Sequence, residues 1–156
     1  MRPTRMRLRI AALAGAAALA ASLTALSAPA AQAATLHYIQ SDYSGYAIAS
    51  DGAVVVLASV GDDFVVKATE KYDGHTYYEY QDKVTGNCLQ ANVTDKVVAE
   101  GGCAQNARQF WWYDSAKLLV NRYFGTKACA EGKESGASVD LSRGSGLACD
   151  WTVGDA

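Results

Sequence analysis

Few side chains in this sequence are of the types that carry out covalent chemistry. The chain has two histidines, His37 and His75, and no Gly-x-Ser-x-Gly elbow, His-Glu-x-x-His pair or phosphate-binding glycine loop. His37 falls in an apolar run that predicts a strand, and His75 follows an Asp-Gly turn. We interpret both as structural or solvated residues. The sequence therefore predicts no catalytic residue and no cofactor, and we expect that the protein is not an enzyme.

The cysteines are the more informative set. They are Cys88, Cys103, Cys129 and Cys149. An even number of cysteines indicates disulfides where a chain is exported, which the N-terminal segment described next favours, and four cysteines allow three pairings. A zinc site is the alternative, but there is no Cys-x-x-Cys and only the two histidines could complete it. The sequence favours disulfides and predicts no metal site.

The segment from Met1 to Ala33 is typical of a secretory signal peptide. Four arginines precede an apolar run rich in Ala and Leu, and the triplet Ala31-Gln32-Ala33 follows. A membrane anchor is the alternative, but the run is short for a bilayer span and ends in a cleavage pattern. We expect cleavage after Ala33 and a secreted, extracellular protein. The Ala and Arg bias of the segment is bacterial in character.

Cleavage would leave an acidic domain. Of the 14 basic and 16 acidic residues, the segment removed contains four arginines and no acidic residue, so residues 34–156 have ten basic residues against sixteen acidic ones and a net charge of −6. Contacts with phosphate groups need clustered Lys and Arg. Nucleic acid and membranes are therefore not expected partners.

The exported part repeats about every 41 residues, a period within the range that marks repeat architectures. Residues 35–49, 76–90 and 117–131 each contain an apolar run, a polar residue, a turn with a glycine and a second apolar stretch. The turn glycines are Gly45, Gly86 and Gly125, and the second stretches open at Ala47, Cys88 and Cys129. The fourth short strands are expected at Phe64 to Ala68, Gln109 to Tyr113 and Asp150 to Val153.

Each unit thus offers four short strands between turn signals, with no helix of useful length. Twelve short strands in three copies predict an all-β protein with the β-trefoil fold, and units at 35–75, 76–116 and 117–156. A β-sandwich has no reason to repeat three times at a fixed period. A propeller needs at least four blades.

The second unit carries the most specific motif. Cys88-Leu89, Val97-Val98, Cys103 and Gln109-Phe110-Trp111 follow one another in that order. This pattern resembles the ricin-type (ricin B-like) β-trefoil lectin family, and the resemblance covers residues 35–156. It implies sugar binding without catalysis. It also implies a disulfide within each cysteine-bearing unit, Cys88–Cys103 and then Cys129–Cys149.

The Gln-x-Trp residues are interpreted first as a core clamp. Trp111 suits a centre shared by three units, and Trp151 matches it in the third unit. Gln109 can hold backbone groups where the strand leaves the barrel, because buried amides must be paired. Phe64 or Val66 is expected to take the same place in the first unit. Contact with a sugar is the alternative for Gln109.

No unit keeps all the sugar-binding positions that the resemblance implies. The position of the sugar-binding Asp holds Ala49, Gln90 or Glu131, and no third strand has an aromatic residue. The Asn before Gln-x-Trp is Arg108. The candidate carbohydrate-binding residues are Gln90, Arg108, Gln109, Trp112 and Glu131. Aromatic residues near the junction of the second and third units could replace the missing platform, and these are Trp112, Tyr113, Tyr123 and Phe124.

Two classes of function are consistent with this pattern. The first is a secreted carbohydrate-binding module, with glycans or a polysaccharide as partner. The second is a protein-binding trefoil, such as a protease inhibitor or an interaction scaffold, with an extracellular protein partner. A long protruding loop would favour the second class. No connection between the expected strands is unusually long, which favours the first.

Overall fold

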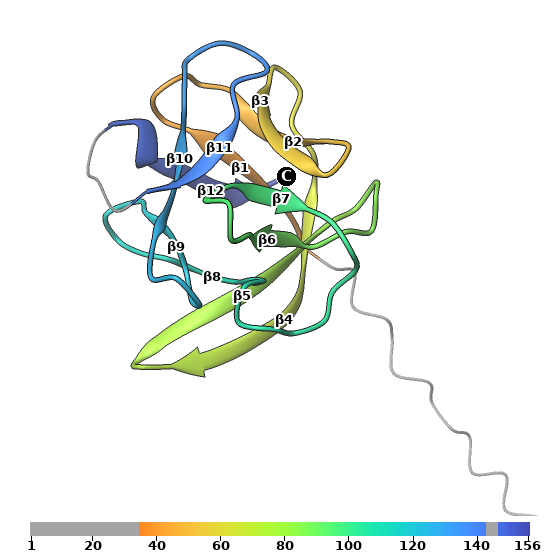
Figure 1. Cartoon of the computed structure of the whole chain (residues 1–156), viewed down its shortest axis with the longest axis vertical. Coiled ribbons are helices and arrows are strands. Elements are labelled where there is room, and N and C mark those ends of the chain that lie inside the picture. Colours follow the sequence, from red (N-terminus) through yellow and green to blue (C-terminus); the bar gives the residue numbers. More distant parts are fainter. Residues whose placement is uncertain (1–34, 143–146) are drawn as a thin grey trace, which may run out of the picture. The chain divides into compact units, whose positions relative to one another are not determined.

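The computed structural model describes residues 35–142 and 147–156, and the predicted signal peptide and the turn at Gly144 to Gly146 lie outside these ranges. The described part forms twelve strands and one short 3-10 helix, η1 (Figure 1). The strands are β1 (Leu36–Ser41), β2 (Ala47–Asp51), β3 (Val54–Ala58), β4 (Phe64–Tyr72), β5 (His75–Asp82), β6 (Leu89–Ala91), β7 (Val97–Ala99), β8 (Phe110–Tyr113), β9 (Leu119–Asn121), β10 (Lys127–Ala130), β11 (Val139–Ser142) and β12 (Trp151–Asp155), and η1 is Leu147–Cys149. No helix in these ranges is long and apolar enough to cross a membrane.

Six strands close a barrel. β1 pairs with both β12 and β4, β4 with β5, β5 with β8, and β8 with β9. A single bridge between Leu118 and Asp150 closes the remaining side. Closure leaves no barrel strand with an unpaired edge. The barrel therefore offers no exposed edge at which another chain could pair and aggregate.

Three hairpins cap one end of the barrel. They are β2–β3, β6–β7 and β10–β11, and they contact one another through single pairs. These pairs are Val54 with Val98, Val56 with Ser138, and Lys96 with Asp140. The fold is a β-trefoil, which confirms the prediction from the repeat.

One large ring from each unit fills the centre of the barrel. Phe64 pairs with His37 in the first unit, and Trp111 pairs with Tyr78 in the second. Trp151 follows the bridge residue Asp150 in the third. All three rings are 0% exposed, whereas Val66 is partly exposed. Phe64 is therefore the first unit's counterpart of the two tryptophans.

The two tryptophans also satisfy buried carbonyls. The Nε1 of Trp111 donates to the carbonyl of Leu89 at 2.9 Å, and that of Trp151 donates to the carbonyl of Ala128 at 2.7 Å. A phenylalanine has no donor. In the first unit the matching carbonyl, that of Ile48, accepts the backbone N–H of Asp62 at 3.0 Å instead.

A glycine makes that replacement possible. A Cβ at Gly61 would lie 2.3 Å from the Cβ of Ala47 and 2.9 Å from the carbonyl oxygen of Ile48. Only a residue without a side chain lets the loop approach β2 so closely. In the first unit a backbone N–H thus satisfies the buried carbonyl, whereas an indole N–H does so in the other two units.

The third unit follows the second more closely than the sequence indicated. The pairs that open the second strands are Gln40 with Ala47, Gln81 with Cys88, and Val120 with Lys127. The step along the chain from Cys88 to Lys127 is two residues shorter than the step from Ala47 to Cys88. The counterpart of Cys88 is therefore Lys127, and the expected match with Cys129 is wrong by two residues.

A buried polar side chain recurs at the turn before each of these strands. Ser41, Asp82 and Asn121 are each 0% exposed, and each accepts backbone N–H bonds from the second and third residues after it. The acceptor satisfies amides that have no sheet partner. We call these three residues the turn clamps.

The cysteines form the two disulfides that the resemblance implied. One joins Cys88 and Cys103, and the other joins Cys129 and Cys149. The described part of the chain has no free cysteine. In the chain-entropy model, closing a loop of about 15 residues adds roughly 3 kcal/mol to the free energy of unfolding.

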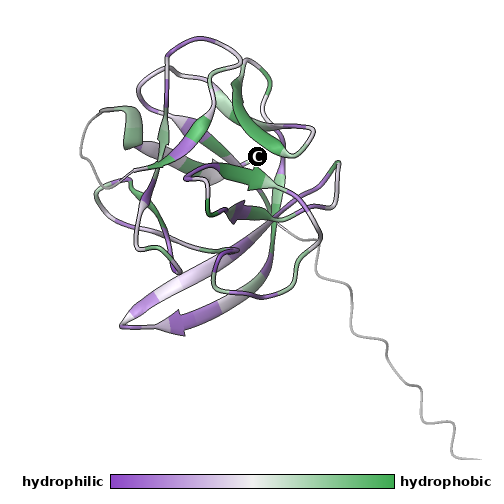
Figure 2. Ribbon diagram, in the orientation of Figure 1, coloured by the Kyte–Doolittle hydropathy of each residue, from purple (hydrophilic) through white to green (hydrophobic). Residues whose placement is uncertain are grey.

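The β4–β5 hairpin projects beyond the barrel (Figure 1). β4 continues to Tyr72, four residues past its expected end at Ala68, with a bulge between Val66 and Ala68. Asp73 and Gly74 form the turn with positive φ angles of 48° and 78°, as two-residue hairpins require. Figure 2 shows that the far part of this hairpin is hydrophilic, while β3, β6 and β7 are hydrophobic. The protrusion comes from long strands and not from a long loop.

Replacing Trp111 with Phe tests the shared centre. We expect Trp111→Phe to lower the free energy of unfolding by about 2–3 kcal/mol, because it removes the donor to the Leu89 carbonyl and leaves a cavity. Trp112→Phe is the matched control, and we expect a loss below about 1 kcal/mol because that side chain is partly exposed. Chemical denaturation followed by fluorescence measures both. Equal losses for the two variants would contradict the assignment of the core.

Candidate functional site

A hollow of about 330 Å³ lies at the junction of the second and third units. It is lined by Gln90, Asn106, Ala107, Arg108 and Tyr123. Two of the predicted sugar-binding residues, Gln90 and Arg108, are therefore brought together. We call this the junction hollow.

Gln90 and the loop before β8 form one side of the junction hollow. Gln90 lies in β6, opposite Val98, with its side chain partly exposed. In the loop, the Oδ1 of Asn106 accepts the backbone N–H of Arg108 at 3.0 Å. The backbone of Arg108 is fixed again from within, because its carbonyl accepts the N–H of Ala91 at 2.9 Å. These bonds fix the place from which the guanidinium extends.

Gln109 supports this loop from below. Its side chain is 1% exposed. Its Oε1 accepts the backbone N–H of Ala104 at 2.8 Å, and its Nε2 donates to the carbonyl of Gly102 at 2.8 Å. The amide is thus engaged by the backbone and is closed to a ligand. The structure places Gln109 in the support of the site and not on its surface.

Tyr123 forms the other side. It lies in the turn after β9 and is 57% exposed. The guanidinium carbon of Arg108 is 4.9 Å from the centroid of the Tyr123 ring and 5.9 Å from that of Phe124. The two rings meet edge to face at 4.7 Å. A cation held over an aromatic face in this way is favourable and orients the guanidinium.

Asn121 ties the two sides together. Its Nδ2 donates to the carbonyl of Arg108 at 2.8 Å, while its Oδ1 accepts the N–H groups of Tyr123 and Phe124 at 3.0 and 3.3 Å. The turn clamp of the third unit is therefore also the residue that positions the exposed ring against the loop of the second unit. Asn121 was not predicted as a site residue. The usable signal was that a polar residue stands at the matching place in every unit, as Ser41, Asp82 and Asn121.

The junction of the first and second units has different chemistry. Ala49 and Asp62 stand where the second unit has Gln90 and Gln109. The Oδ2 of Asp62 accepts the N–H of Ser50 at 2.6 Å, and the hydroxyl of Ser50 donates to Asp82 at 2.8 Å. Burial, together with the nearby charge of Asp82, raises the pKa of Asp62.

Asp82 shows the opposite shift. Burial alone would raise its pKa, but hydrogen bonds from the hydroxyls of Ser50 and Thr85 and from the N–H groups of Val84 and Thr85 outweigh burial and hold the pKa below its usual value. This clamp therefore works best as a carboxylate. The polar groups of this junction are occupied by one another.

The third junction lacks the amide altogether. Cys129, which is bonded to Cys149, takes the place of Gln90. The Nζ of Lys133 lies 4.2 Å from the centroid of the Tyr43 ring, an arrangement that echoes Arg108 over Tyr123. Tyr43 is the counterpart of Tyr123, since each lies two residues after its turn clamp. It gives a matched control position outside the junction hollow.

Glu131 lies apart from the junction hollow. The two-residue shift in the third unit moves it out of the position expected for the sugar-binding Asp. Its Oε1 is 3.2 Å from the Nζ of Lys96, and the hydroxyl of Ser138 donates to its Oε2. The interaction with Asp140, followed by those with Ser138 and Lys96, lowers the pKa of Glu131 to about 2. Glu131 thus belongs to a surface ion-pair network between the cap hairpins.

Trp112 is also elsewhere. Its ring stacks on His75 with centroids 3.6 Å apart and planes at 26°. Tyr77 lies 6.5 Å away. The aromatic residues expected to cluster are thus divided, with Trp112 against the β4–β5 hairpin and Tyr123 with Phe124 at the junction hollow.

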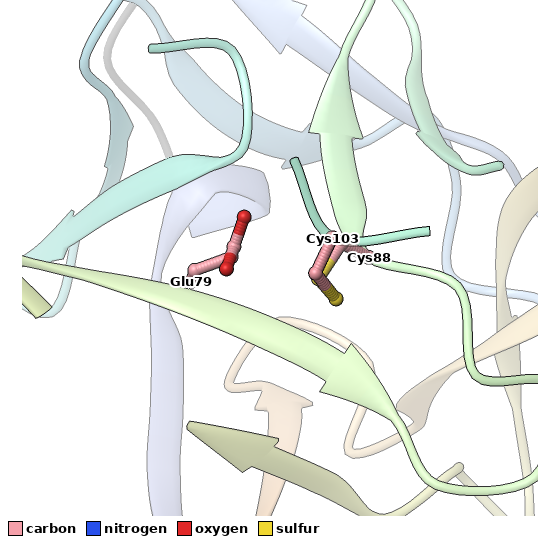
Figure 3. A group of neighbouring side chains, drawn as sticks. All are labelled: Glu79, Cys88 and Cys103. Carbon is pink, nitrogen blue, oxygen red and sulfur yellow. A yellow bond between two sulfur atoms is a disulfide. The ribbon is translucent and has the colours of Figure 1, made fainter. Parts of the chain in front are cut away.

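One group of side chains has the composition of a metal site. Glu79, Cys88 and Cys103 place their potential ligand atoms within 4.8 Å of one another. Figure 3 shows that the two sulfurs are joined as a disulfide beside the Glu79 carboxylate, so neither is a thiolate that could bind a metal ion. The Oε1 of Glu79 instead accepts the N–H of Gln105 at 2.8 Å. The group supports the loop that carries Asn106 and Arg108.

Comparisons with known proteins extend only to the fold. No model of a known protein family matches the sequence, and no curated protein is a significant match. The designed three-fold symmetric protein ThreeFoil matches with a TM-score of 0.65 and 24% identity, over 78% of this chain and 99% of ThreeFoil. The C-half of the earthworm R-type lectin, solved in complex with GalNAc, matches with a TM-score of 0.53 and 12% identity, over 78% and 99%.

A lectin from Polyporus squamosus, bound to Neu5Aca2-6Galb1-4GlcNAc, matches with a TM-score of 0.59 and 14% identity. The match covers 78% of this chain but only 49% of that lectin. At these identities the likeness shows a shared fold. The resemblance seen in the sequence therefore holds at the level of the β-trefoil fold.

The clamp at Asp82 predicts a pH-dependent stability. A carboxylate with a lowered folded-state pKa adds stability above the unfolded pKa of about 3.9 and loses it as the pH falls through the folded value. We expect Asp82→Asn, which copies the clamp of the third unit, to cost about 1 kcal/mol at pH 7, because the amide oxygen can still accept the backbone N–H groups and only the charge is lost. The gap between variant and wild type should close below about pH 3. Denaturation at several pH values measures it, and a gap independent of pH would contradict the prediction.

Proposed function

We propose that this protein is a secreted, non-catalytic carbohydrate-binding module whose working site is the junction hollow. The observation that carries the proposal is the pairing of an exposed, oriented ring with converging polar groups. Tyr123 offers a flat apolar surface, while Gln90 and Arg108 offer an amide and a guanidinium in the same hollow. A sugar ring has the complementary surfaces, with C–H groups on its faces and hydroxyls around its edge.

The geometry assigns each residue a task. A sugar packs one face on Tyr123, whose backbone Asn121 holds beside the Arg108 loop. The guanidinium of Arg108 donates to ring or hydroxyl oxygens, and the Gln90 amide both donates and accepts. Asn106 and Gln109 hold the loop in place before the ligand arrives, which lowers the entropic cost of binding.

The two lectin structures with the same fold support this proposal, since one was solved in complex with GalNAc and the other bound to Neu5Aca2-6Galb1-4GlcNAc. The site proposed here differs from the arrangement that the family resemblance implied. Its ring comes from the turn of the following unit and not from the third strand. Its first polar contact is an amide in place of a carboxylate.

The β4–β5 hairpin favours a second candidate, a protein-binding surface. Tyr72 at the hairpin end is 53% exposed, and the guanidinium of Arg122 lies 4.6 Å from its ring centroid while forming an ion pair with Glu70 at 2.7 Å. Exposed Tyr and Arg side chains are common at protein interfaces. The hairpin and the junction hollow use different residues, so the two candidates can be tested apart.

Glycan arrays and polysaccharide pull-down with the purified protein, followed by calorimetry on the best ligand, test the carbohydrate proposal. We expect Tyr123→Ala to weaken binding by about tenfold, because it removes the stacking surface. Arg108→Ala should weaken binding by a similar factor, since it removes a charged donor.

The matched control is Tyr43→Ala, which removes the equivalent ring at another junction and should leave affinity within about twofold of wild type, like an ordinary surface substitution. Trp112→Ala serves as a second control at the hairpin. An absence of any glycan ligand would reject the proposal. Loss of binding in Trp112→Ala but not in Tyr123→Ala would move the site to the hairpin.

A further inference from the structure

A second hollow of about 270 Å³ lies at the barrel end opposite the cap. β1 and β5 lead from this end toward the cap hairpins, and β4, β8 and β12 return to it. The lining residues come from these five strands, and they are His37, Val66, Tyr78, Tyr80, Tyr113, Val153 and Asp155. We call this the barrel-end hollow.

The barrel-end hollow lies against the core of the barrel. Val66, Tyr113 and Val153 each follow a central ring by two residues, and side chains two apart on a strand face the same side. They form the next layer after Phe64, Trp111 and Trp151. The hollow is therefore built by all three units and shares no lining residue with the junction hollow.

Aromatic side chains dominate its wall. The rings of Tyr78 and Tyr80 are 6.1 Å apart and inclined at 37°, and the His37 ring meets Tyr80 edge to face at 6.3 Å. Tyr113 adds a third phenol, whose hydroxyl donates to the Trp151 carbonyl at 2.8 Å. Three phenol rings thus surround one space.

Tyr80 is the unusual member. Its side chain is 3% exposed, and no residue in the described ranges forms a hydrogen bond with its hydroxyl. Burial also raises the pKa of Tyr80, so the hydroxyl stays neutral with a lone pair available. The hydroxyl is not among the fully enclosed polar atoms without a partner in the described ranges, so it opens into the hollow as a neutral acceptor that a ligand can reach.

The charges around the hollow limit the class of ligand that could bind there. None of its lining residues is Lys or Arg, and the one carboxylate is that of Asp155, 3.2 Å from the Nδ1 of His37. Phenol faces and a carboxylate both attract positive charge. The amide and guanidinium groups that a sugar would need are absent from this lining.

We propose that the barrel-end hollow binds a small organic cation, an alkylammonium group. The faces of the tyrosine rings contact the cation, and Asp155 supplies the opposite charge at the rim. An N–H of the ammonium group donates to the unpaired hydroxyl of Tyr80. This site is separate from the proposed carbohydrate site, and neither depends on the other.

Calorimetry and NMR titration with defined probes test the proposal. Choline chloride and 3,3-dimethyl-1-butanol have nearly the same shape, but only choline is charged. We expect choline to bind at one site at least about tenfold more tightly than the neutral alcohol, and to shift the NMR signals of Tyr78 and Tyr80. Equal binding of the two probes, a preference for galactose at this site, or no choline binding up to about 100 mM, beyond the weakest specific affinities, would each overturn the proposal.

Two mild variants add a sharper readout. Tyr80→Phe keeps the ring and removes a hydroxyl that has no protein partner, so folding should be unaffected. It should weaken methylammonium, which has N–H donors, by about fivefold and leave tetramethylammonium unchanged. Asp155→Asn should weaken both ions, and Tyr43→Ala should weaken neither. Equal effects of Tyr80→Phe on both ions would overturn the hydrogen bond assigned to Tyr80.

Discussion

The structure depends on the burial of three large rings, Phe64, Trp111 and Trp151, at one shared centre. No single unit could shield such a ring from water by itself. The three units must therefore fold around one another, and closure of the barrel follows from that requirement. The indole N–H groups also place the cap, since each donates to the first buried residue of its own second strand. The same contacts thus fix both the barrel and the hairpins above it.

The repeat and the fold could be predicted because each unit must bury one large ring at the same centre, which constrains the three units in the same way. The apolar runs, the turn glycines and the two tryptophans all follow from it, and the disulfides lie within units. The offset of the third unit could not be predicted in this way. A step that is shorter by two residues is invisible when Cys129 happens to align with Cys88. That error moved Glu131 into a pocket in which it does not lie.

The candidate site was only partly predictable for a different reason. Gln90 and Arg108 were found because their positions follow from the repeat, and Tyr123 was one of several possible rings. Its selection depends on Asn121, whose amide reaches the Arg108 carbonyl across a unit boundary. The stacking of Trp112 on His75 likewise depends on the length of β4, which continues past the expected Ala68. Contacts between units do not follow from the pattern within a unit.

The two hollows are under different physical constraints. The walls of the junction hollow include a loop and a turn, which Gln109 and Asn121 hold through backbone bonds. Side chains there can change without disturbing the central rings, which explains how the other two junctions came to hold a carboxylate pair or a disulfide in the same place. The barrel-end hollow borders the layer beside those rings, so its residues affect both ligand contact and packing. The hydroxyl of Tyr80 opens into this hollow, where it can accept a hydrogen bond from a ligand without disturbing the packed rings. The convergence of three phenol rings and one carboxylate beside so constrained a layer is the strongest reason to assign that hollow a ligand.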